Sequence, residues 1–206
     1  MDISEYAKKN NLTAVIMNPY NFTYLTGIRS NGVLIQKKNK IILLSPLDKQ
    51  KKGSIPLTKE NLEKSISGIR KIGLEMSTIK YNKYKELKKK YVKDISPAIE
   101  KARSIKTPKE VRYIRKACRY TEEILAEVLK SIKKKKTECE IQALIFHSIY
   151  KRGLEPAFPP IVASGKNAGI PHHIPDTKPI QKGFLIIDLG VKYKGYCSDM
   201  TRTFYL

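Results

Sequence analysis

The pattern of secondary-structure signals changes near residue 100 of this 206-residue chain, and the change limits the folds that the chain can adopt. Before that point, short apolar runs alternate with helix-like segments, which is typical of an α/β layer domain. After it come two long amphipathic helices and then a strand-rich stretch. The order predicts two domains, an α/β domain over residues 1–100 and an α+β domain over residues 101–206, each long enough to bury a core.

Local patterns predict where the elements of the first domain lie. They indicate a strand over 12–17, a turn over 18–21, a hairpin of 32–36 with 40–44, helices over 57–69 and 80–91, a strand over 71–75 and a loop over 95–98. The alternation of these strands and helices is the basis for assigning the segment to the α/β class.

Two capping boxes mark helix starts in the second domain. Thr107 with Glu110 predicts the first start, and Thr137 with Glu140 predicts the second, whose helix stops at Gly153. The first helix carries an apolar stripe of helical period, formed by Val111, Ile114, Cys118, Leu125, Val128, Leu129 and Ile132. Strands are expected beyond the helices, over 161–164, 184–188 and 196–204.

The large basic excess does not indicate a nucleic-acid-binding protein. The formal net charge is +22, but only eight of the 41 basic residues are arginine. Phosphate and base recognition favour arginine, because its guanidinium group forms two parallel hydrogen bonds. The lysines form no stacking platform with aromatic residues. We therefore interpret the charge as a solvated, lysine-rich surface and expect no nucleic-acid partner.

The other bulk features indicate a cytoplasmic protein without a membrane partner. No apolar run approaches the roughly 18 to 20 residues that cross a bilayer, and the amino terminus has no basic segment followed by an apolar one. Three cysteines, Cys118, Cys139 and Cys197, are too few and too scattered for a disulfide framework. We expect them to be reduced and buried.

An aspartate follows the apolar run Phe184–Ile187, and a second one comes eleven residues after it. A carboxylate at the end of a buried strand is costly unless it is paired or bound to a cation. The segment Lys192–Gly195 can reverse the chain, so that the flanking segments form a hairpin. A loop with an even number of residues places Asp188 and Asp199 on one face, whereas a three-residue loop places them on opposite faces.

Spacing alone leaves two interpretations of this aspartate pair open. Two carboxylates side by side repel each other unless a divalent cation lies between them, and such a pair suits manganese, cobalt or zinc. Alternatively, Asp188 and Asp199 accept hydrogen bonds from turn amides or from Arg202.

Longer stretches of the chain resemble one family of metallopeptidases. These stretches are residues 161–168, Pro171-His172-His173, Ile187–Gly190 and Gly195–Phe204, preceded by Asn18-Pro19, Tyr24–Gly27, Ile72–Glu75 and Arg103–Glu110. Together they are similar to the pita-bread family, which includes Xaa-Pro dipeptidase (prolidase) and aminopeptidase P. The resemblance covers the whole chain and implies an α/β amino-terminal creatinase-like domain, followed by the first half of an α+β pita-bread catalytic domain.

The resemblance also implies site residues, cofactors and a substrate. Asp188 would bind one of two divalent metal ions, which are manganese, cobalt or zinc, and Asp199 would bridge both. His172 matches the histidine that contacts the substrate or shuttles a proton near the scissile bond, whereas its neighbour His173 has no assigned role. The implied substrate is a di- or oligopeptide cleaved before proline, and full-length members of the family form homodimers.

The chain departs from the family pattern in its metal ligands. The complete site has two aspartates, one histidine and two glutamates, and no histidine follows His173 in these 206 residues. We therefore expect an incomplete fragment that holds metal poorly and is inactive alone, unless a complementing second half supplies the other ligands. The alternative is a non-catalytic pita-bread-like protein that binds peptides or partners. The two aspartates favour the peptidase.

Overall fold

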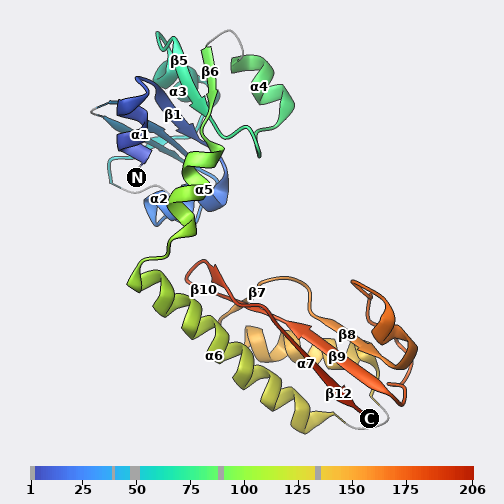
Figure 1. The fold of residues 1–206 in the computed structure, drawn as a ribbon. Coiled ribbons are helices and arrows are strands. Elements are labelled where there is room, and N and C mark those ends of the chain that lie inside the picture. Colours follow the sequence, from blue (N-terminus) through green and yellow to red (C-terminus); the bar gives the residue numbers. More distant parts are fainter. Residues whose placement is uncertain (1–2, 39, 47–51, 88–90, 133–135) are drawn as a thin grey trace. The chain divides into compact units, whose positions relative to one another are not determined.

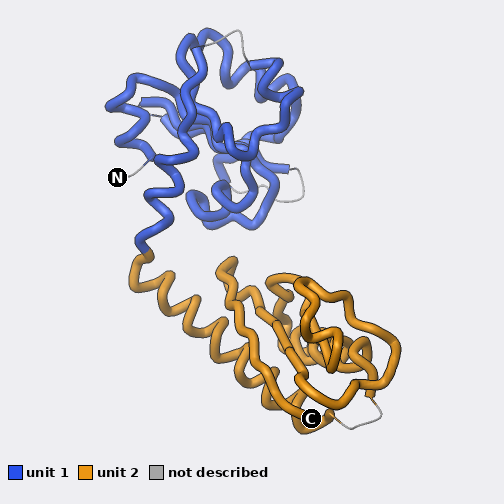
Figure 2. Tube along the Cα trace, turned by 45° about the vertical axis from the view of Figure 1, so that its right-hand side comes forward, with its two compact units in different colours: residues 1–105 blue, residues 106–206 orange. Residues whose placement is uncertain are grey.

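The computed structural model of the chain describes residues 3–38, 40–46, 52–87, 91–132 and 136–206. The chain divides into two compact units, residues 1–105 and residues 106–206 (Figure 2), and each has its own hydrophobic core. Within the described ranges, no helix is both long and apolar enough to span a membrane.

Unit 1 is built around a six-stranded mixed sheet. Its elements are α1 (Ile3–Lys9), β1 (Thr13–Ile16), α2 (Pro19–Thr26), β2 (Val33–Gln36), β3 (Ile41–Ser45), β4 (Ile55–Pro56), α3 (Lys59–Ile66), β5 (Lys71–Leu74), α4 (Tyr81–Leu87), β6 (Tyr91–Asp94) and α5 (Ser96–Ser104). The strand order is β4-β3-β2-β1-β5-β6, with β1–β2 and β2–β3 antiparallel and the other pairs parallel. Figure 1 shows β5 and β6 side by side in this sheet. Because both faces of the sheet are apolar, helices cover both. Helices α1, α2 and α5 pack on one face, and α3 and α4 on the other.

Two segments of unit 1 that the sequence indicated as turn or loop are helix starts. The Asn18 side chain accepts hydrogen bonds from two backbone N–H groups of α2 and so caps that helix. Helix α5 begins at Ser96, with a proline in its first turn. The turn predicted over 18–21 and the loop predicted over 95–98 are therefore wrong, because asparagine and proline also mark helix starts.

The hairpin prediction for unit 1 is confirmed, and one helix prediction is too long. Strands β2 and β3 pair antiparallel as expected, although Asn39 of their loop lies outside the described residues. The helix predicted over 80–91 corresponds to α4, which ends at Leu87. Residue 91 already belongs to β6.

Unit 2 packs two long helices against antiparallel strands. Its elements are α6 (Pro108–Ser131), α7 (Glu138–Tyr150), β7 (Glu155–Pro156), β8 (Ile161–Ser164), the 3-10 helix η2 (Gly165–Gly169), β9 (Phe184–Leu189), β10 (Val191–Tyr193), β11 (Tyr196–Cys197) and β12 (Met200–Tyr205). The strand orders are β12-β9-β8 and β11-β10-β7. Both predicted capping boxes are present, at Thr107 and Thr137, so α6 and α7 start where the sequence indicated.

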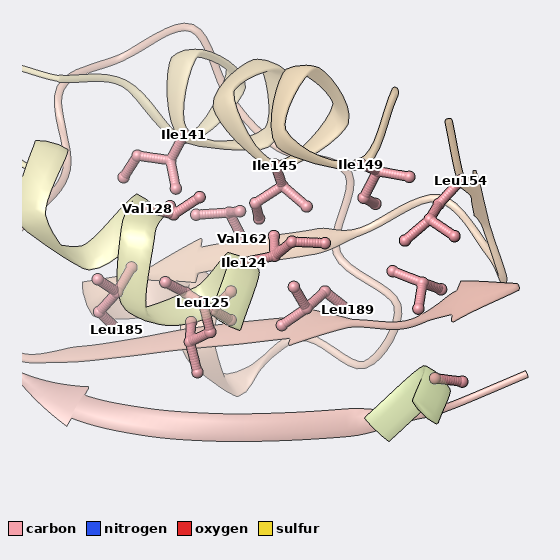
Figure 3. Packing of buried hydrophobic residues seen from close by; sticks show 13 residues of the cluster. Ile124, Leu125, Val128, Ile141, Ile145, Ile149, Leu154, Val162, Leu185 and Leu189 are labelled. Carbon is pink, nitrogen blue, oxygen red and sulfur yellow. The ribbon is translucent and has the colours of Figure 1, made fainter. Parts of the chain in front are cut away.

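The core of unit 2 lies between α6, α7 and the sheet. Figure 3 shows the side chains that fill it, which include Ile124, Leu125 and Val128 of α6, Ile141, Ile145 and Ile149 of α7, and Val162, Leu185 and Leu189 of the strands. Along β9, Leu185, Ile187 and Leu189 are buried. Because side chains alternate along a strand, Asp188 points to the face away from the helices.

The cysteines are not the buried thiols that the sequence suggested. Cys118 on α6 and Cys197 on β11 are exposed, and Cys139 is partly buried. Cys118 lies outside the apolar stripe, because the buried face of α6 runs through Ala117 and Thr121 instead. The prediction of buried thiols is therefore wrong for Cys118 and Cys197.

Candidate metal centre

A two-residue loop joins β10 and β11, the two short strands that lie between the aspartates in the sequence. Lys192 pairs with Cys197 and Tyr193 with Tyr196, which leaves Lys194-Gly195 as the loop. Both loop residues have positive φ, 52° and 89°, as a type I′ hairpin turn requires. The loop is therefore even-numbered, which is the condition for the two aspartates to share a face.

The strand register places Asp188 and Asp199 diagonally on that face. Thr201 of β12 lies opposite Asp188 of β9, and Asp199 stands two residues before Thr201. Residues two apart in extended chain share a face, so the aspartates are diagonal neighbours. The neighbours of Asp199 support this orientation, because Ser198 is buried and Met200 packs against the core.

The hydrogen bonds around the pair favour one of the two open interpretations. The Thr201 hydroxyl donates to Asp188 Oδ1 at 2.9 Å. Arg202 donates to the Thr201 carbonyl oxygen at 2.9 Å, and in the described part of the chain it forms no ion pair with either aspartate. Arg202 therefore does not neutralise the two carboxylates, which leaves them available to a cation.

The segment before Asp199 is held by buried contacts. The hydroxyl oxygens of Thr121 on α6 and Ser198 lie 2.6 Å apart, and Val191 N–H donates to Ser198 Oγ at 3.0 Å. On the other arm of the hairpin, a Cβ added at Gly190 would lie 2.1 Å from the Ser198 carbonyl oxygen. Only glycine fits at this position, because the two arms of the hairpin approach each other so closely between Asp188 and Asp199.

Asp199 also borders an open cavity of about 330 Å³. The cavity is lined by Cys118 and Glu122 of α6, Ser198, Asp199 and the first residues of β12, Met200, Thr201 and Arg202. Small ligands can therefore reach this end of the hairpin from solvent.

The donor set fits part of a divalent-metal site. Two carboxylates on one face suit cations that prefer oxygen ligands. However, among the residues that the structure describes, no group of three or more His, Cys, Asp or Glu side chains is placed to hold a metal ion. The pair would thus offer two ligands, and a tightly held ion needs more.

His172 lies apart from this pair, in the loop that follows η2. Its side chain is exposed, and its φ of 53° lies in the left-handed region. Among the described residues, His172 belongs to no candidate metal-binding group, and it does not line the cavity beside Asp199. The structure therefore brings Asp188 and Asp199 together but does not join His172 to them.

The loop of His172 has an anchor that sequence reasoning missed. Glu138, the first residue of α7, is 1% exposed, and its carboxylate accepts hydrogen bonds from Ser164, Asn167, His173 and Asp176. Burial raises the pKa of Glu138, but these hydrogen bonds outweigh burial and bring the pKa below its ordinary value of 4.5. The sequence signal was a glutamate directly after the helix cap, which usually lies in solvent.

Two family models match the chain, one in each unit. The Creatinase/Prolidase N-terminal domain matches residues 4–105, and Metallopeptidase family M24 matches residues 112–206. The chain belongs to the pita-bread M24 family. It contains the creatinase-type amino-terminal domain and part of the M24 domain, as the predicted fold class stated.

Relatives of this pita-bread chain carry Xaa-Pro peptidase names. The chain is 32% identical to the Xaa-Pro dipeptidase of Pyrococcus horikoshii, over 98% of this chain and 62% of that relative. The prolidase structure from the same organism has a TM-score of 0.90 at 31% identity and covers 99% of this chain and 63% of the other. The prolidase structure from Pyrococcus furiosus has a TM-score of 0.88 at 28% identity, covering 98% and 64%. The chain thus spans less than two thirds of each.

Proposed function

We propose that this chain provides Asp188 and Asp199 to a dinuclear metal site of an Xaa-Pro peptidase, which hydrolyses the bond before proline in a di- or oligopeptide. The observation that supports the proposal is the register of β9 and β12, in which Thr201 lies opposite Asp188 and Asp199 stands two residues before Thr201. The names of the relatives, Xaa-Pro dipeptidase and prolidase, support the substrate class.

The two aspartates and His172 have different proposed roles. Asp188 and Asp199 would hold the cations, for which their oxygen ligands suit manganese, cobalt or zinc. Bound divalent cations supply Lewis acidity, which makes water a better nucleophile and polarises a peptide carbonyl. His172 would contact the substrate near the scissile bond and hydrogen-bond the developing oxyanion.

We further propose that the remaining ligands correspond to the part of the relatives that this chain does not match. Two observations support this: the described residues offer two ligands on the shared face, and relatives are longer than this chain. A homodimer and a cytoplasmic location are part of the same proposal, and the free cysteines are consistent with a reducing compartment.

A chimera tests the proposed function. Residues 1–206 would be joined to the part of the Pyrococcus horikoshii Xaa-Pro dipeptidase that this chain does not cover, and assayed with an Xaa-Pro dipeptide and Mn²⁺ or Co²⁺. We expect hydrolysis by the chimera, and a loss of at least about a hundredfold in Asp199→Ala, because even outer-shell changes at metal sites cost 10- to 100-fold. The 206-residue chain alone should show no turnover above background.

Two results would contradict parts of this proposal. Turnover by the 206-residue chain alone that disappears in Asp199→Ala would show that no further ligands are needed. A folded chimera that binds the dipeptide without hydrolysing it would instead favour the non-catalytic binding protein.

A further inference from the structure

One buried carboxylate joins four segments of unit 2. Glu138 Oε1 accepts from Ser164 N at 2.7 Å and from Ser164 Oγ at 2.8 Å. Glu138 Oε2 accepts from His173 Nε2 at 2.7 Å and from Asp176 N at 2.9 Å. Asn167 Nδ2 lies 3.1 Å and 3.3 Å from the two oxygens. Helix α7, the end of β8, η2 and the loop after η2 therefore share one acceptor group.

These contacts hold both ends of the loop that carries His172. Ser164 precedes the segment 165–175, and Asp176 follows it. The backbone N–H of Cys139 donates to the Asp176 carbonyl oxygen at 3.1 Å, which ties the same end of the loop to α7 a second time. The loop is therefore fixed to the first turn of α7 at its start and at its end.

His172 has a backbone conformation that needs support from its surroundings. Its φ of 53° is strained for a residue with a Cβ, and such strain persists only where the surroundings maintain it. The His172 side chain is exposed, so its own packing does not hold it. The next residue is held, because the His173 side chain is 12% exposed and bonded to the buried Glu138.

We propose that Glu138 is a positioning residue for His172, which keeps the left-handed backbone of His172 in place by holding His173 and Asp176. The inference rests on the proposed function for the role of His172 at the substrate, but the conformation itself can be measured without metal or turnover. The pKa of Glu138 lies below its ordinary value, so the carboxylate is ionised and accepts hydrogen bonds at neutral pH.

NMR on the full 206-residue chain tests the proposal with Glu138→Gln. Glutamine keeps the size but replaces one acceptor oxygen by an NH₂ group, so donors that face it lose their partner. We expect the amides of Ser164 and Asp176 to exchange with solvent at least about tenfold faster, since hydrogen bonds to charged groups are the stronger ones. The ¹³Cα and ¹³Cβ shifts of His172 should move away from left-handed values.

The matched control is Glu127→Gln, which removes the same charge from unit 2 outside the loop. Glu127 links α6 to the end of α7 through Lys151 and Arg152. This control should leave the His172 shifts unchanged. A purely structural role of Glu138 would lower the stability of the chain without moving the His172 signals of the folded state, and that result would overturn the proposal.

A second pair of variants applies if Glu138→Gln does not fold. His173→Leu should shift the His172 signals, whereas His173→Gln, whose side-chain amide can still donate to Glu138, should restore them. Equal signals in the two variants would overturn the proposal. Failure of the peptidase proposal is distinguishable, because Mn²⁺ binding is measured on variants of Asp188 and Asp199 and does not enter this readout.

Discussion

Replacing Gly190 with alanine is expected to destabilise unit 2 by about 3 kcal/mol, at the upper end of the usual cost of overpacking. The new Cβ would lie 2.1 Å from the Ser198 carbonyl oxygen. That oxygen belongs to the backbone of the opposite hairpin arm, so it cannot turn aside as the end of a side chain would. The clash should push the arm that carries Asp199 away from the strand that carries Asp188.

Hydrogen exchange of the β9 amides in the full chain would report this loss as a lower unfolding free energy of unit 2. Gly169→Ala is the matched control. Gly169 ends η2 without a positive φ, and a Cβ there meets no atom within 4 Å, so the control should change stability by no more than about 0.5 kcal/mol. Similar stabilities of the two variants would contradict the close approach at Gly190.

Removing the buried carboxylate with Glu138→Ala is expected to cost about 3 to 5 kcal/mol of unit 2 stability, the range seen when one partner of a buried charged network is deleted. Donors from Ser164, His173 and Asp176 would lose their acceptor. Because the folded pKa of Glu138 lies below 4.5, the part of this stabilisation that depends on the ionised carboxylate is fully present above about pH 4.5 and is lost as the pH falls through the folded pKa.

The stability difference between wild type and Glu138→Ala should therefore shrink as the pH falls below 4.5. Exchange of the α7 amides at several pH values would measure it. Glu127→Ala is the control, because Glu127 lies at the surface and its pKa is lowered to about 2 by Lys151 and Arg152. We expect a much smaller loss for these partly exposed ion pairs. A difference for Glu138→Ala that is independent of pH would contradict the ionised network.

The sequence predicts those structural features that depend on residues close together in the chain. The capping boxes at Thr107 and Thr137 were visible because the cap and its partner are three residues apart. Whether Asp188 and Asp199 share a face depends on the length of one loop, because that loop sets the register and side chains alternate along each strand. The family resemblance then supplied the fold class.

The misses involve contacts between segments that are distant in the sequence. Glu138 meets His173, 35 residues away, and no local pattern distinguishes it from a solvated glutamate in a first helical turn. The sequence pattern puts Cys118 in an apolar stripe, but in the structure the buried face of α6 runs through Ala117 and Thr121. The Asn18 segment was ambiguous for another reason, because the same residues start turns and helices.

Titration of the ¹⁵N-labelled chain with Mn²⁺ tests most directly whether Asp188 and Asp199 form a metal-binding pair. We predict one weak site, with a dissociation constant of about a millimolar, and paramagnetic broadening centred on the amides of both residues. Asp188→Asn and Asp199→Asn should each abolish it, whereas Glu123→Gln, which removes an exposed carboxylate of α6, should not. Broadening that is centred elsewhere, or that survives both aspartate substitutions, would contradict the account.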